Sequence, residues 1–115
     1  MNQRVEQRLN KSLLAYTDGD GSNLLGVISN ISKNGLFIET HSTFLPETEI
    51  SFVLAVYSEL YRLKGEVRWA KHPGDAYPLE LPAGMGIRIT EAPVEYINYV
   101  EFVKYQMRPS NHLTH

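Results

Sequence analysis

Six short runs of strand-forming residues follow one another along the chain, and turn-forming residues separate each run from the next. The runs span residues 12–16, 23–29, 35–40, 49–56, 61–69 and 84–90. No connection carries the helical pattern that would link parallel strands, so the strands are expected to be antiparallel. The sequence therefore predicts an all-β body.

A helical pattern follows the last strand-like run. Pro93 suits the first turn of a helix, and apolar residues then recur at spacings of three and four until Pro109: Val94, Ile97, Val100, Val103 and Met107. We expect a C-terminal α-helix over residues 93–108 and a tail over residues 109–115. Closing a small sheet into a barrel removes its unpaired edges, so the strands are predicted to form a six-stranded antiparallel β-barrel within residues 11–92.

Composition limits the classes of protein that the chain can represent. The 115 residues are 43% hydrophobic, which suits one domain with a modest core. A net charge of -2, from 11 Lys and Arg against 13 Asp and Glu, argues against a general nucleic-acid binder. There is no cysteine, residues 1–10 lack the apolar core of a signal peptide, and the longest apolar run falls far below the ~20 residues of a membrane helix. A soluble, cytoplasmic protein without membrane insertion is expected.

Two polar motifs stand apart from this core pattern. Residues 30–35 (Asn-Ile-Ser-Lys-Asn-Gly) join the second and third strand-like runs as a hairpin corner. Gly35 would tolerate a positive φ there, or would let a ligand approach the backbone closely. Upstream, Arg4 and Arg8 lie four residues apart in a polar segment, residues 1–10, for which a helical turn is possible and a flexible arm is favoured.

Together, RxxxR followed by [DN]xSxxG resembles the PilZ domain family, whose members are receptors for cyclic di-GMP. The resemblance extends to residues 36–40, 65–69 and 84–87, which fall where the family has its third strand, its GxVxW-like strand and its GxGxxF-like strand. It thus runs from about Arg4 to Met107. It implies a PilZ-like six-stranded barrel with helical additions, in agreement with the strand pattern.

The resemblance also implies a ligand-binding site. Its residues would be Arg4, Arg8, Asn30, Ser32 and Gly35. The planar fork of Arg can bind phosphate oxygens or the edge of guanine bidentately, while Asn and Ser supply short donors and acceptors on a rigid corner. Binding would order the arm, which a protein partner, not identifiable from sequence, would detect. No residue of this set is placed to break a bond, so we expect a binding protein with no catalytic residue and no cofactor.

Two other functions remain as alternatives. One is a PilZ-like interaction module that has lost the nucleotide and binds only protein, for instance in motility or pilus assembly. The other is a small β-barrel that binds single-stranded nucleic acid, which the net charge and the lack of interleaved aromatic and basic residues disfavour.

Other candidate features are interpreted as structural. Residues 18–22 resemble the start of a calcium loop, but Asn23 and Ser29 stand where its Gly and bidentate Glu belong, and the histidines lie in loops or the tail. No metal site is therefore predicted. Gly84 and Gly86 are interpreted as packing or bulge positions. Four aromatic residues are expected to cover the core, although an aromatic-rich helix would also suit a partner surface: Trp69, Tyr96, Tyr99 and Tyr105.

Overall fold

The structure is a computed structural model that describes residues 13–17, 23–77, 79 and 81–106. It contains six strands and a helix: β1 (Leu13–Thr17), β2 (Leu24–Ile31), β3 (Gly35–Glu39), β4 (Glu49–Val56), β5 (Glu59–Lys71), β6 (Gly84–Glu91) and α1 (Val94–Gln106). All bounds agree with the predicted ranges within two residues, and β5 extends two residues beyond its predicted run at each end. The predicted arm (1–10), the turn at 18–22 and the tail (109–115) lie outside the described residues.

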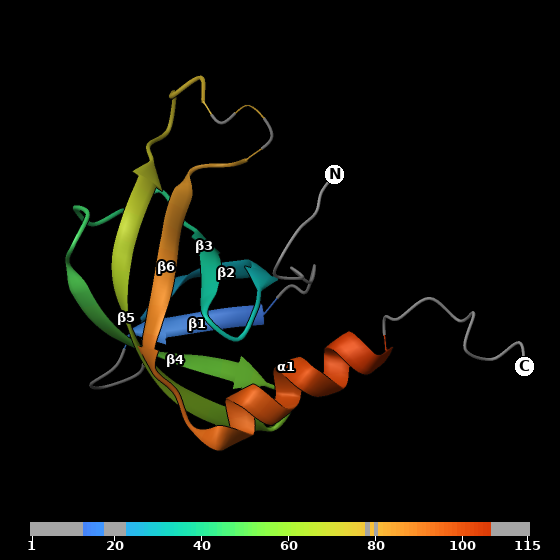
Figure 1. Cartoon of the computed structure of the whole chain (residues 1–115). Helices are drawn as coiled ribbons and strands as arrows, with labels where there is room; N and C mark the ends of the chain where they lie inside the picture. Colours follow the sequence, from blue (N-terminus) through green and yellow to red (C-terminus); the bar gives the residue numbers. More distant parts are fainter. Residues whose placement is uncertain (1–12, 18–22, 78, 80, 107–115) are drawn as a thin grey trace, which may run out of the picture.

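All neighbouring strands are antiparallel, and the sheet closes on itself. The strand order around the barrel is β1-β2-β3-β6-β5-β4, with β1 paired to both β2 and β4. The prediction of a closed six-stranded antiparallel barrel with a C-terminal helix is thus confirmed. In Figure 1, α1 lies at one end of the barrel and the loop between β5 and β6 extends from the other.

The core fills the barrel and continues under α1. Every strand contributes buried apolar side chains, among them Ala15, Ile28, Leu36, Ile38, Leu54, Leu63, Val67 and Met85. The helix adds one buried face, consisting of Tyr96, Tyr99, Val100 and Val103. Removing this apolar surface from water is the main stabilising contribution, so α1 is an integral part of the domain.

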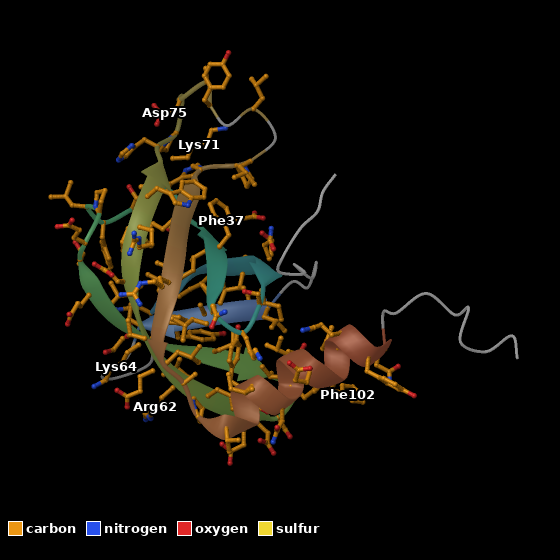
Figure 2. The ribbon with its side chains drawn as sticks, viewed as in Figure 1. Phe37, Arg62, Lys64, Lys71, Asp75 and Phe102 are labelled. Carbon is orange, nitrogen blue, oxygen red and sulfur yellow. The ribbon has the colours of Figure 1, made fainter. Side chains whose placement is uncertain are left out.

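The two ends of the barrel carry different side chains (Figure 2). Lys71, at the end of β5, is buried and donates a hydrogen bond to the carbonyl of Leu81 across the β5–β6 loop. Phe102 lies on α1 and is 53% exposed. The expectation that the helix tyrosines cover the core is confirmed for Tyr96 and Tyr99 but wrong for Tyr105, which is 60% exposed because it lies on the opposite side of the helix from Val103.

A β-bulge in β5 changes which residues face the core. Val67 pairs with Ile87, but Trp69 pairs with Gly86, so Arg68 is an extra residue in β5. Strict alternation would put Trp69 inside with Val67, and the extra residue moves it to the outer face. The prediction that Trp69 covers the core is therefore wrong: its side chain lies outside the barrel and is 39% exposed.

A second irregularity lies in β2. Ile28 pairs with Ile38, and Asn30 pairs with Phe37. A step of two residues along β2 therefore corresponds to a step of only one residue along the antiparallel strand β3. The shift allows Ile28 and Ile31 both to be buried in the core, although three positions separate them. It also leaves Asn30 opposite Phe37, at the start of the predicted hairpin corner.

Candidate functional site

The corner, residues 30–35, is closed by Ser32. Its backbone N–H donates to the carbonyl of Gly35 over 2.9 Å, and its hydroxyl both donates to that carbonyl and accepts the N–H of Gly35, each over 3.1 Å. Ser32 is buried. In the structure, Ser32 therefore stabilises the turn. Its role as a ligand contact stays a prediction.

Gly35 is the first residue of β3, and its φ is not positive. Among the described residues, positive φ values occur at Gly74 and at two non-glycine residues, Glu47 and Tyr57. Of the two roles considered for Gly35, a positive φ is therefore not observed, because this residue already belongs to an extended strand. Glycine is favoured here because the neighbouring strand leaves little room for a side chain. A Cβ atom at position 35 would stand 2.9 Å from the carbonyl oxygen of Ile87.

The helix and β6 hold the corner from behind. The hydroxyl of Tyr96, which is fully buried, donates to the carbonyl of Ser32 over 2.8 Å. The N–H of Ile89 donates to the carbonyl of Asn34, also over 2.8 Å. These bonds satisfy carbonyls that the turn leaves unpaired, so the corner is a rigid feature.

An aromatic pair covers the outer face beside the corner. The rings of Phe37 and Trp69 are stacked, with centroids 5.4 Å apart and an interplanar angle of 26°. They occupy the space that glycines leave on β6: a Cβ atom at Gly86 would stand 2.3 Å from Nε1 of Trp69, and one at Gly84 would stand 2.6 Å from Cζ of Phe37. The prediction that these glycines are packing positions agrees with this geometry.

A surface cavity of about 210 Å³ opens next to the corner on this outer face. Residues of the corner, β3, β5 and β6 line it: Asn34, Gly35, Leu36, Phe37, Arg68, Trp69, Gly86, Ile87 and Arg88. The lining combines an aromatic surface, two guanidinium groups and the backbone of the motif. Such a mixture of apolar and polar groups is typical of a ligand site.

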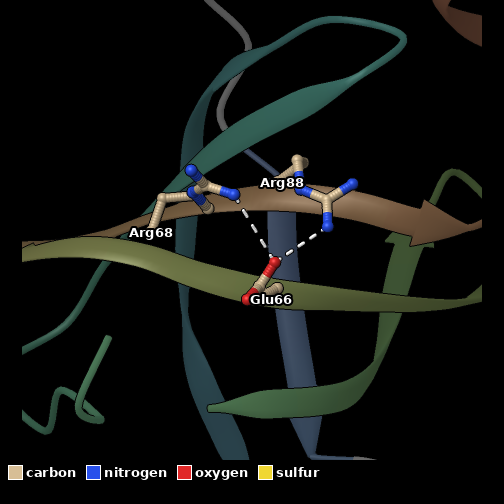
Figure 3. A network of polar contacts seen from close by, with 3 residues as sticks. All are labelled: Glu66, Arg68 and Arg88. Carbon is tan, nitrogen blue, oxygen red and sulfur yellow. Dashed lines mark hydrogen bonds and ion pairs between the residues drawn. The ribbon is translucent and has the colours of Figure 1, made fainter. Parts of the chain in front are cut away.

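Glu66 links the two arginines of this cavity (Figure 3). Nη2 of Arg88 donates to Oε1 of Glu66 over 2.8 Å, and Nη1 of Arg68 lies 3.6 Å from the same oxygen. The hydrogen bond from Arg88, together with the charges of both arginines, lowers the pKa of Glu66 from its ordinary value. Glu66 therefore stays ionised and offsets part of the positive charge at the cavity.

The structure brings together some of the predicted site residues. Asn30, Ser32 and Gly35 all belong to the corner, whereas Arg4 and Arg8 lie outside the described residues. Three side chains of the cavity lining were not among the predicted site residues: Arg68, Trp69 and Arg88. Arg68 and Trp69 belong to the GxVxW-like strand and Arg88 follows the GxGxxF-like residues 84–87, but neither pattern indicates that these side chains share a cavity.

Within the described parts of the chain, no group of three or more His, Asp or Glu side chains could hold a metal ion. The described helix α1 is too short and too polar to cross a membrane. The chemistry present at the cavity is that of binding: cations, an aromatic face and backbone groups.

Comparisons with known proteins agree with this architecture. A solved structure of the Bacillus subtilis inhibitor of motility, MotI/DgrA, superimposes with a TM-score of 0.67 at 14% sequence identity. The match covers 95% of this chain but only 55% of that one, and at such low identity it shows the shared fold alone. No curated protein matches the chain. The family model described as PilZ domain matches residues 2–104. The chain therefore belongs to the PilZ domain family, whose members are cyclic di-GMP receptor or adaptor modules and not enzymes.

Proposed function

We propose that this chain is a receptor for cyclic di-GMP and that the nucleotide binds on the outer face of the barrel, beside the corner. The observation that carries the proposal is the cavity that Trp69, Arg68, Arg88 and the corner line together. Cyclic di-GMP presents guanine bases and phosphodiester groups. An exposed indole ring offers a stacking surface for a base, and guanidinium groups match phosphate oxygens or the guanine edge.

The size of the cavity suggests a role for the N-terminal arginines. A cavity of about 210 Å³ is smaller than the ~300–1,000 Å³ that encloses a drug-sized ligand. A cyclic dinucleotide would fill it only in part and would leave an outer side uncovered. Arg4 and Arg8, which match the RxxxR motif, are proposed to contact that outer side, while Asn30 and the rigid corner contact the side against the barrel.

Arm closure is the proposed signal to a protein partner. Residues 1–10 carry few apolar side chains, and ordering backbone costs about 1–2 kcal/mol per residue. Contacts of Arg4 and Arg8 with the ligand would offset that cost. Limited trypsin digestion tests this step, because both arginines are cleavage sites. Saturating cyclic di-GMP should slow cleavage after Arg4 and Arg8, and equal rates with and without nucleotide would contradict arm closure.

Calorimetric titration with cyclic di-GMP tests the binding itself, and Trp69 provides an optical readout because it is the only tryptophan in the chain. The wild type should bind, with a change in tryptophan emission. Arg8→Ala should weaken binding roughly tenfold to a hundredfold, as expected for a lost charge-assisted contact. Lys33→Ala is the matched control, because Lys33 is an exposed turn residue whose ammonium lies 3.9 Å from Glu101 on α1.

Absence of binding would instead favour the nucleotide-free interaction module. One observation supports such a function in its own right: large apolar side chains are exposed around α1 and the β4–β5 turn, namely Tyr57, Leu60, Phe102 and Tyr105. The likeness to an inhibitor of motility makes motility a reasonable pathway in which to search for the partner.

A further inference from the structure

We propose that Arg68 and Arg88 form a phosphate-binding pair on the barrel wall, and that Glu66 holds their guanidinium groups until a phosphodiester replaces its carboxylate. This inference rests on the proposed function and deepens it, since it assigns one chemical group of the ligand to residues outside the RxxxR and [DN]xSxxG motifs.

The first support is the position of the two arginines. Both line the cavity, and they reach it from different strands, β5 and β6. Glu66 pairs with Arg88 across these strands, and the bulge at Arg68 adds the second guanidinium on the same outer face. Two like charges are thereby held beside one anion (Figure 3).

The second support is the charge balance of the cluster. Two cations and one carboxylate leave a single positive charge. The side chains of Arg68 and Arg88 are 56% and 52% exposed, so their remaining N–H donors are open to solvent. A phosphodiester has the charge and the paired oxygens of a carboxylate, so it can accept the same hydrogen bonds from a guanidinium fork. Glu66 itself does not line the cavity.

The third support is the surroundings. Trp69 and Gly35 line the same cavity as the arginines. A base stacked on the indole would place its attached sugar and phosphate within reach of the adjoining wall. An ordinary surface ion pair would need neither the cavity nor the aromatic neighbour.

Calorimetry with cyclic di-GMP on single variants tests the proposal. Arg68→Gln and Arg88→Gln should each weaken binding roughly tenfold to a hundredfold. Glu66→Gln should tighten binding about two- to fivefold, because the variant removes a competing negative charge and keeps the shape of the side chain. Unchanged affinity in both arginine variants would overturn the proposal, and so would weaker binding in Glu66→Gln.

Arg62→Gln is the matched control. Arg62 lies on the same strand and does not line the cavity, and Figure 2 shows it near Lys64, far along β5 from Lys71. The affinity of the Arg62→Gln variant for cyclic di-GMP should equal that of the wild type. If Arg62→Gln weakened binding as much as Arg88→Gln, the effect would be one of overall charge, and the local pair would be rejected.

A separate probe distinguishes failure of this inference from failure of the proposed function. If the wild type binds cyclic di-GMP but tolerates both arginine substitutions, only the phosphate pair is wrong. If the wild type binds no cyclic di-GMP, titration with inorganic pyrophosphate, followed through the Nε–H signals of arginine, still tests the pair. Signals that shift in the wild type and are lost in Arg68→Gln and Arg88→Gln would support an anion site, and signals of these two residues that do not shift would overturn it.

Discussion

The two faces of β3 both carry buried apolar side chains, but those side chains pack against different partners. Ile38 points into the barrel and is fully buried in the main core. Its neighbour Phe37 is also buried, with 3% exposure, yet it lies outside that core and stacks on Trp69. The inner face excludes water by packing apolar side chains from every strand. The outer face excludes water by stacking Phe37 and Trp69 over the glycines of β6. It also leaves a cavity that two arginines line.

This difference suggests that the inner face determines stability, whereas the outer face determines binding. Ile38, on the inner face of β3, belongs to a core of buried apolar side chains that is closed off from solvent. The outer face presents the indole ring of Trp69 and the guanidinium groups of Arg68 and Arg88 at the cavity. Substitutions on either side of the same wall can therefore separate the two contributions.

The largest effect on stability is expected from Ile38→Ala. Removing a fully buried isoleucine leaves a cavity in the core, and such substitutions cost about 2–5 kcal/mol in free energy of unfolding. Chemical denaturation measures this loss. The affinity of the folded protein for cyclic di-GMP, measured well below the melting temperature, should change less than twofold. A large loss of affinity in the folded variant would show that the two faces are not independent.

Gly86→Val should affect both properties. Its side chain would meet the indole of Trp69, which would have to leave its stack on Phe37. Overpacking of this kind costs about 1–3 kcal/mol. We also expect cyclic di-GMP binding to fall at least tenfold, with tryptophan emission shifted toward that of an exposed indole. Ala83→Val, at a position just before β6, is a control for added volume, and normal binding by Gly86→Val would disprove the role of the aromatic surface.

Tyr96→Phe tests the connection between the core and the corner. The variant removes the hydroxyl that donates to the carbonyl of Ser32 and leaves that buried carbonyl without this donor. Such a loss costs about 1–3 kcal/mol. Because the corner would keep the Ser32–Gly35 bonds, we expect a smaller loss of affinity than in Gly86→Val. Tyr77→Phe, in the β5–β6 loop where the side chain is 76% exposed, should leave the unfolding free energy nearly unchanged in the same denaturation experiment.

The smallest effect is a pH dependence from Glu66. Its pKa is lowered in the folded protein, mainly by the hydrogen bond from Arg88. The contribution of this carboxylate to stability is therefore fully present above its ordinary pKa of 4.5 and is lost as the pH falls through the lower, folded value. The small stability difference between wild type and Glu66→Gln should be constant near neutral pH and shrink in acid. A difference that grew as the pH fell would contradict the ion pair.

Much of the fold was predictable because it depends on local patterns. Turn residues and apolar alternation marked all six strands, and the spacing from Val94 to Val103 marked the helix. The corner was also recognisable, since Ser32 and Gly35 are its characteristic residues. The alternative of a positive φ at Gly35 is not observed, and the space for a side chain there is limited by β6, a strand that is distant in sequence.

The sequence by itself determined the number of strands, their antiparallel arrangement, the helix and the motif residues of a PilZ domain. Each of these depends on residues that lie close together in the chain. Only the tertiary structure decided which face Trp69 occupies and that Arg68 and Arg88 share a cavity with the corner. The reason is the pairing of β5 with β6. The extra residue at Arg68 exists only relative to the partner strand, and alternation along β5 alone places Trp69 in the core.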